Sequence, residues 1–163
     1  MKVALVNLIT LSRIVLAIII FLLLAIDNYL EVALILFTIA GLTDYLDGYF
    51  ARKFSLTSQL GEILDPIADK IVIIFIFFVL ELNLSSYLIG FIGSCIITRE
   101  IWVSALRDLN SRNLNVEATK VIFLAKIKTS IQLLTIFIYL TALAFDKMLL
   151  IIFGDIFMII SLL

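Results

Sequence analysis

Long apolar runs, separated by short polar stretches, make up most of this chain. Each run holds about 17–25 residues, which is the length of a helix that crosses a bilayer core of about 30 Å. Backbone amides inside lipid must be paired within their own segment, so each run is predicted to be helical. The six runs are Asn7–Ile26, Leu30–Arg52, Ser58–Leu82, Tyr87–Leu109, Lys120–Ala144 and Lys147–Leu163. The pattern predicts an all-α integral membrane protein with six transmembrane helices.

Composition supports this prediction. Hydrophobic residues make up 64% of the 163 positions, and the mean hydropathy is +1.25. Soluble domains average nearer 45–50% apolar residues. The chain has one proline and no linker, repeat or low-complexity tract. Residues 1–163 are therefore predicted to form a single transmembrane domain.

The basic residues indicate how the helices are oriented. If six helices alternate in direction, Lys147 is the one basic residue at its set of helix ends, where it is accompanied by acidic residues. The other set of ends holds Lys2, Arg13, Arg52, Lys53, Lys70, Arg99, Arg107, Arg112, Lys120, Lys126 and Lys128. Cytoplasmic loops are enriched in Lys and Arg, so this basic side is predicted to be cytoplasmic, together with both termini.

Two residue types are almost absent. The chain has no histidine, which removes the commonest general base, the commonest zinc ligand and any Ser-His pair. Its single cysteine, Cys95, lies in the fourth apolar run and is expected to be an inert buried thiol. Catalysis, if present, must depend on other side chains.

Four aspartates interrupt the apolar pattern in the stretch "DYLDGYFARKFSLTSQLGEILDPIAD", residues 44–69. Helical spacing places Asp44, Asp47, Gly48 and Ala51 on one face of the second helix, and Gly61, Asp65 and Asp69 on one face of the third. A short connection makes these two helices antiparallel neighbours. The four carboxylates are therefore expected to converge near the cytoplasmic interface.

Converging carboxylates indicate a metal site. They repel one another unless cations lie between them, and all-oxygen ligands favour Mg²⁺, Mn²⁺ or Ca²⁺. Two such ions about 3.5–4 Å apart are typical of enzymes that carry out displacement at phosphorus. The glycines admit a substrate close to the backbone, and Arg52 offers a planar donor to phosphate oxygens. Helix capping by aspartates in a solvated loop would explain one or two carboxylates, but not four.

This stretch resembles the signature of the CDP-alcohol phosphatidyltransferases, D-x-x-D-G-x-x-A-R, eight residues, then G-x-x-x-D-x-x-x-D. All eight fixed positions match: Asp44, Asp47, Gly48, Ala51, Arg52, Gly61, Asp65 and Asp69. The resemblance implies the family fold and transfer of a phosphatidyl group from a CDP-activated lipid to an alcohol, with release of CMP. It implies that the four aspartates hold two ions, Mg²⁺ or Mn²⁺, and that Asp69 is also the catalytic base. Gly48, Ala51, Arg52 and Gly61 correspond to CDP-binding positions.

Three further segments resemble the phosphatidylglycerophosphate synthases within that family. They are "NLITLSRIV", with Asn7, Thr10 and Arg13 in place, "TREIWVSALRD" in the fourth helix, and "AKIKTSIQ" in the fifth. Ala125 stands where that group usually has glycine. The resemblance implies CDP-diacylglycerol and glycerol 3-phosphate as substrates, with Thr10 among the CDP-lipid contacts. It also implies a homodimer in the inner membrane of a bacterium, with the active site facing the cytoplasm and no nucleic-acid partner.

Charge supports a phosphorylated acceptor. Arg99 and Arg107 are eight residues apart, within about 80° on a helix, and Lys126 lies on the cytoplasmic half of the next helix. These three cations suit the acceptor phosphate, although each could instead anchor a helix end. Inositol phosphate, serine or phosphatidylglycerol remain alternative acceptors. A cation channel or transporter would place carboxylates near the bilayer midplane, and a purely structural anchor would not require the glycines.

Overall fold

The structure of the protein is a computed structural model that describes the backbone of residues 2–26, 29–54, 59–112 and 123–162. Side chains are described for residues 11–26, 29–43, 67–68, 70–106, 108–110 and 127–162. The described chain forms α1 (Lys2–Ala25), α2 (Leu30–Phe54), α3 (Gln59–Leu84), α4 (Tyr87–Arg112), α6 (Phe123–Ala144) and α7 (Met148–Leu162). No strand occurs in these segments. The all-helical prediction is confirmed.

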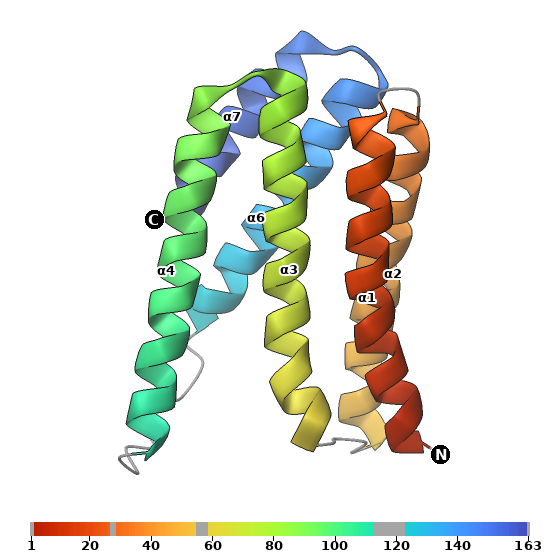
Figure 1. The fold of residues 1–163 in the computed structure, drawn as a ribbon, viewed down its shortest axis with the longest axis vertical. Helices are drawn as coiled ribbons and strands as arrows, with labels where there is room; N and C mark the ends of the chain where they lie inside the picture. Colours follow the sequence, from red (N-terminus) through yellow and green to blue (C-terminus); the bar gives the residue numbers. More distant parts are fainter. Residues whose placement is uncertain (1, 27–28, 55–58, 113–122, 163) are drawn as a thin grey trace.

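The helices alternate in direction along one bundle (Figure 1). The N-terminus, the end of α2, the start of α3 and the end of α4 lie at one end, which we call the N-terminal end. α6 crosses obliquely behind α3. α1 packs against α2 and α3, α4 packs against α3 and α7, and α6 contacts α2, α3 and α7. α2 and α3 are antiparallel as predicted, but the contacts made by the described residues of α2 are with α1 and α6.

Apolar side chains cover both the inside and the outside of the bundle. The core includes Ile20, Leu24, Ile76 and Leu80, all almost completely buried. Large apolar residues are also exposed on the outer surface, among them Val15, Ile35, Phe78, Phe91, Trp102 and Ile152. Soluble proteins rarely expose so much contiguous apolar surface. This surface is suited to contact with lipid chains.

Within the described residues, two helices are long and apolar enough to cross a membrane, over Tyr87–Asn110 and Ile127–Ala144. Shorter apolar segments are Leu11–Ala25, Leu30–Thr43 and Met148–Leu162. α7 has 15 residues, which at 1.5 Å per residue span about 22 Å. Length and composition therefore support a membrane protein, and six complete crossings remain a prediction.

A close contact joins α6 to α7. The buried Tyr139 hydroxyl donates a hydrogen bond of 2.6 Å to Asp155 Oδ1 and lies 3.6 Å from Met158 Sδ. Gly154 makes the contact possible, because a Cβ at this position would lie 2.6 Å from Tyr139 Cε1. A carboxyl group within an apolar helix is costly unless it has a partner. The tyrosine supplies that partner, which accounts for an aspartate in the middle of α7.

At the other turns, polar side chains satisfy helix ends. Asn83 Nδ2 donates to the carbonyl oxygen of Leu24 at 3.2 Å and to that of Val79 at 2.9 Å. The first bond supplies a partner to one of the last carbonyls of α1, which have none within their own helix. Ser85 and Asp146 take the left-handed conformation, with φ of 46° and 51°, where α3 and α6 end. These turns lie at the end of the bundle opposite the N-terminal end.

Candidate functional site

The backbone places all four aspartates toward the N-terminal end of the bundle. Asp44 and Asp47 lie in the last part of α2, and Asp65 and Asp69 lie in the first half of α3. The end of α2 and the start of α3 are close to one another in Figure 1. Their carboxylates lie outside the described side chains, so convergence on metal ions stays a prediction. Among the side chains that are described, no group of three His, Cys, Asp or Glu could hold a metal ion.

The other predicted site residues also belong to helices. Thr10 lies on α1, Gly48, Ala51 and Arg52 on α2, Gly61 on α3, Arg107 on α4 and Lys126 on α6. Each lies in the part of its helix nearer to the N-terminal end: α1 and α3 start at that end, α2 and α4 finish there, and α6 starts part-way along the bundle and runs toward the opposite end. The side chains of these residues lie outside the described set. Their roles in binding CDP-lipid and acceptor stay predictions.

Arg99 is the one predicted acceptor-binding residue whose side chain is described. Its Nη1 donates to the carbonyl oxygens of Ser161 at 3.0 Å and Leu162 at 3.1 Å. Its Nη2 donates to Glu100 Oε1 at 2.8 Å. The guanidinium therefore satisfies carbonyls at the C-terminal end of α7, where positive charge is favourable.

These bonds do not engage all the N–H donors of the Arg99 guanidinium. Arginine carries five N–H donors, and the three hydrogen bonds of Arg99 engage at most three of them. At least two N–H groups thus remain for another acceptor, as far as the described residues determine. Arg99 can cap α7 and still donate to a phosphate oxygen.

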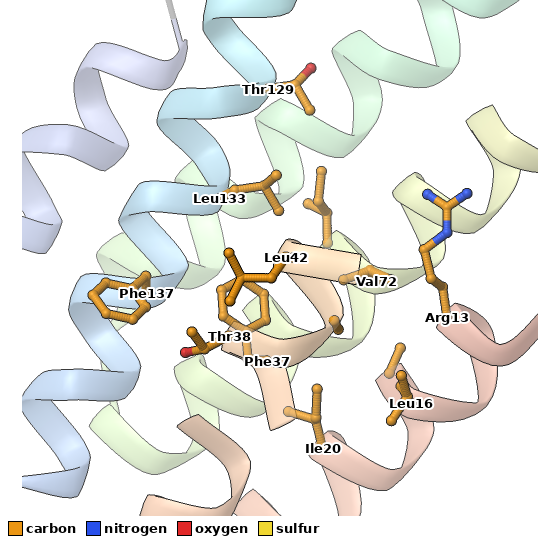
Figure 2. Close-up of a pocket in the computed structure, with 14 residues that line it drawn as sticks. Arg13, Leu16, Ile20, Phe37, Thr38, Leu42, Val72, Thr129, Leu133 and Phe137 are labelled. Carbon is orange, nitrogen blue, oxygen red and sulfur yellow. The ribbon is translucent and has the colours of Figure 1, made fainter. Parts of the chain in front are cut away.

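A pocket of about 290 Å³ opens between α1, α2, α3 and α6 (Figure 2). Apolar side chains make up most of its wall, including Ile20, Phe37, Leu133 and Phe137. The described polar groups are few. Thr38 donates to its own helix at Leu34 O, while Arg13 and Thr129 lie nearer the N-terminal end of their helices than the apolar residues do. The pocket is therefore graded, apolar at one end and more polar at the other.

The polar end of this pocket adjoins the aspartate turns. Leu42 lines the pocket and precedes Asp44 by two residues, and Val72 lines it and follows Asp69 by three. Both separations are less than one helical turn. The pocket could not be predicted from the sequence, because the apolar residues that face it have the same composition as those that face lipid. The one signal available was Arg13, whose charge is unusual so far along an apolar run.

Comparison with known proteins decides the family. The family model described as CDP-alcohol phosphatidyltransferase matches residues 3–163. The chain belongs to this family. Its members generally use divalent cations, which agrees with the four aspartates of α2 and α3 that the sequence predicts as metal ligands.

The chain is also similar to several proteins named CDP-diacylglycerol–glycerol-3-phosphate 3-phosphatidyltransferase. It is 40% identical to that of Blochmanniella floridana over 102 residues, covering 63% of this chain and 54% of the relative. It is 38% identical to that of Wigglesworthia glossinidia brevipalpis over 103 residues, covering 63% and 57%. The identity to that of Haemophilus influenzae is 35% over 102 residues, covering 63% and 55%. The chain thus spans little more than half the length of these curated relatives.

Proposed function

We propose that the chain transfers the phosphatidyl group of CDP-diacylglycerol to sn-glycerol 3-phosphate, producing phosphatidylglycerophosphate and CMP. The observation that carries the proposal is the complete eight-position signature on the parts of α2 and α3 that meet at one end of the bundle. Membership of the family supports the reaction type. The names of the relatives support glycerol 3-phosphate as the acceptor.

The ligand set fits two divalent cations, Mg²⁺ or Mn²⁺. Asp44, Asp47, Asp65 and Asp69 supply only oxygen atoms, which hard cations prefer. The family-wide use of divalent cations agrees with this choice. Bound there, the cations would neutralise charge on the transferred and leaving phosphates.

The residues of the chain divide the remaining work. Asp69 accepts the proton of the acceptor hydroxyl, whose oxygen forms a bond to the phosphatidyl phosphorus. The bond from that phosphorus to the CMP oxygen breaks, and its electron pair leaves with CMP. Thr10, Gly48, Ala51, Arg52 and Gly61 hold the CDP moiety, while Arg99, Arg107 and Lys126 hold the acceptor phosphate through charged hydrogen bonds.

The graded pocket suits the lipid part of the donor. Its apolar wall accepts acyl methylenes, whose removal from water is favourable. Its polar end, near Arg13 and Thr129, leads to the aspartate turns where the pyrophosphate would lie. The pocket therefore orients CDP-diacylglycerol with its headgroup toward the metal ligands.

The membrane arrangement belongs to the same proposal. Six helices cross the inner membrane of a bacterium, with both termini and the active site on the cytoplasmic side. The support is the concentration of Lys and Arg at one set of helix ends and the apolar outer surface. The protein acts as a homodimer by analogy with its family.

An acceptor screen tests the function. The purified protein in detergent receives CDP-diacylglycerol, Mg²⁺ or Mn²⁺, and one of glycerol 3-phosphate, inositol phosphate, serine or phosphatidylglycerol. CMP release is expected with glycerol 3-phosphate, together with a product of the mass of phosphatidylglycerophosphate, and EDTA should abolish both. Turnover with serine alone would overturn the acceptor. No CMP release with any acceptor, in protein that is folded by circular dichroism, would overturn the reaction itself.

A further inference from the structure

A lysine that directly follows the last signature aspartate bonds to the neighbouring helix. Lys70 Nζ on α3 donates a hydrogen bond to Ser104 Oγ on α4, and both side chains are partly buried. Neither residue is among the predicted metal ligands or the predicted acceptor-binding residues. Among the described residues, this bond joins α3 to α4.

The surroundings of the lysine make that bond important. Lys70 and Glu100 share a hollow of about 20 Å³ between α3 and α4, whose other walls are Ile73, Ile74, Ile96, Ile97 and Ile101. A lysine stem packs well along such apolar walls, but the ammonium group needs polar partners. The Ser104 hydroxyl supplies one. The contact therefore fixes α4 against α3 at a defined register.

Position in the sequence gives this register a functional meaning. Successive helical residues are about 100° apart, so Lys70 points away from the face of α3 that carries Asp65 and Asp69. On α4, Ser104 precedes Arg107 by three residues, which places the two on the same face. One hydrogen bond thus connects the turn of the catalytic aspartate to the turn of an acceptor-binding arginine.

We propose that Lys70 is a positioning residue, which through Ser104 holds the Arg107 turn of α4 in register with the Asp69 turn of α3. The inference rests on the proposed function. It acts on acceptor binding and leaves the metal ligands in place, because the lysine side chain is directed to α4. A small displacement of a charged donor weakens its hydrogen bond to the acceptor phosphate, so loss of a single tether between the two turns should weaken acceptor binding.

Steady-state kinetics of Lys70→Met, Lys70→Arg, Ser104→Ala and the double variant Lys70→Met/Ser104→Ala test the proposal. We expect Lys70→Met and Ser104→Ala each to raise KM for glycerol 3-phosphate about ten-fold, with kcat and the KM for CDP-diacylglycerol changed less than about three-fold. The double variant should be no worse than Lys70→Met, because both remove the same bond. Lys70→Arg, which can still reach the hydroxyl, should recover most of the acceptor affinity.

Two controls and one measurement without turnover accompany the kinetics. Thr98→Ala removes a hydroxyl of the same helix whose hydrogen bond, among the described residues, stays within α4, to Ser94 O at 2.8 Å. Lys147→Met removes an exposed lysine at the far end of the bundle. Both should leave the acceptor KM unchanged. The Mn²⁺ dissociation constant, measured by electron paramagnetic resonance, should stay within about three-fold of the parent value in Lys70→Met.

Several results would overturn the proposal. An unchanged acceptor KM in Ser104→Ala, with a large rise in Lys70→Met, would mean that the lysine does not act through the serine. Additive losses in the double variant would mean the same. A marked fall in the Mn²⁺ affinity of Lys70→Met would mean that the lysine supports the metal ligands rather than the acceptor site. If Lys70→Met does not fold, Ser104→Ala and Lys70→Arg decide the matter. The parent protein separates this inference from the proposed function, which fails only if the parent releases no CMP with glycerol 3-phosphate.

Discussion

The close contact between Gly154 and Tyr139 predicts that the Gly154→Ala substitution, although small, lowers the stability of the protein. Gly154→Ala adds one methyl group to a buried position of α7. The added Cβ would lie 2.6, 2.8 and 2.9 Å from three carbon atoms of the Tyr139 ring. Carbon atoms normally approach to about 3.5–4.0 Å. The ring or the helix must therefore move by roughly 1 Å.

Neither can move freely. Tyr139 is completely buried, and its hydroxyl is held by Asp155. Overpacking of this kind costs about 1–3 kcal/mol, and a lost hydrogen bond adds about 0.5–1.5 kcal/mol. Alanine gains about 1 kcal/mol over glycine in helix propensity. The net loss should be about 0.5–3.5 kcal/mol, which lowers Tm by roughly 1–14 °C for a chain of this size.

Gly93→Ala is the matched control. It makes the same chemical change within α4, but there the new Cβ would meet Phe77 Cβ at 3.5 Å and Met158 Cε at 3.7 Å, which are ordinary contacts. Its Tm should equal or exceed that of the parent. Unfolding is followed in detergent by far-ultraviolet circular dichroism at one scan rate. A Gly154→Ala variant as stable as Gly93→Ala would refute the reasoning, because the ring would then have yielded at no cost.

Three further predictions concern the remaining polar groups. Tyr139→Phe should lower the free energy of unfolding by about 1–3 kcal/mol, measured by the same thermal scans, because it leaves Asp155 without its donor. Asp44→Asn should reduce kcat more than ten-fold, over about 1.4 kcal/mol in barrier height, and a smaller loss would exclude it as a metal ligand. Arg107→Gln and Lys126→Gln should each raise the acceptor KM about 10- to 150-fold, since a charged hydrogen bond contributes about 1.5–3 kcal/mol. Normal acceptor KM values in both would make the two residues helix-end anchors.

Much of the architecture could be predicted from the sequence because lipid leaves the backbone few choices. Each of the six apolar runs overlaps one helix of the part of the chain that the structure describes, with ends shifted by up to five residues. The predicted Tyr87–Leu109 run, for example, is α4, Tyr87–Arg112. The eight signature positions could be recognised as a set because they match the spacing of the pattern that the stretch resembles, and helical periodicity places seven of them on one face of α2 and one face of α3. The family match confirms that the chain belongs to the family, and the roles of the eight residues stay predictions.

Helix neighbours were harder to predict than helices. A short connection predicts that α2 and α3 are neighbours at their aspartate-bearing ends, which lie outside the described side chains, and the described part of α2 contacts α1 and α6. Connection length limits the distance between two helix ends, but side-chain shape decides which helices pack along their length. In an apolar chain, residues that face a neighbour and residues that face lipid have the same composition. The pocket between α1, α2, α3 and α6 could not be found for this reason.

The structural roles of the polar residues far from the signature could not be predicted either, because each role depends on a partner in another helix. Asp155 has no local explanation in an apolar run, and only its contact with Tyr139, sixteen residues earlier, supplies one. The charge of Arg99 indicates a cytoplasmic helix end or a phosphate ligand, but not that it caps α7. A single sequence contains no record of which polar groups meet.

α7 links the contact with Tyr139 of α6 to the contact with Arg99 of α4. Gly154 and Asp155 fix it to α6, and six to eight residues later its last carbonyls, those of Ser161 and Leu162, accept hydrogen bonds from Arg99. Tyr139 lies thirteen residues after Lys126 on α6, a distance of about 20 Å along the helix. A change at Tyr139 should therefore reach the site mainly through α7 and Arg99. Gly154→Ala should therefore change the affinity for glycerol 3-phosphate and leave the affinity for Mn²⁺ unchanged. The aspartates belong to α2 and α3, and among the described residues α7 is not seen to contact either helix.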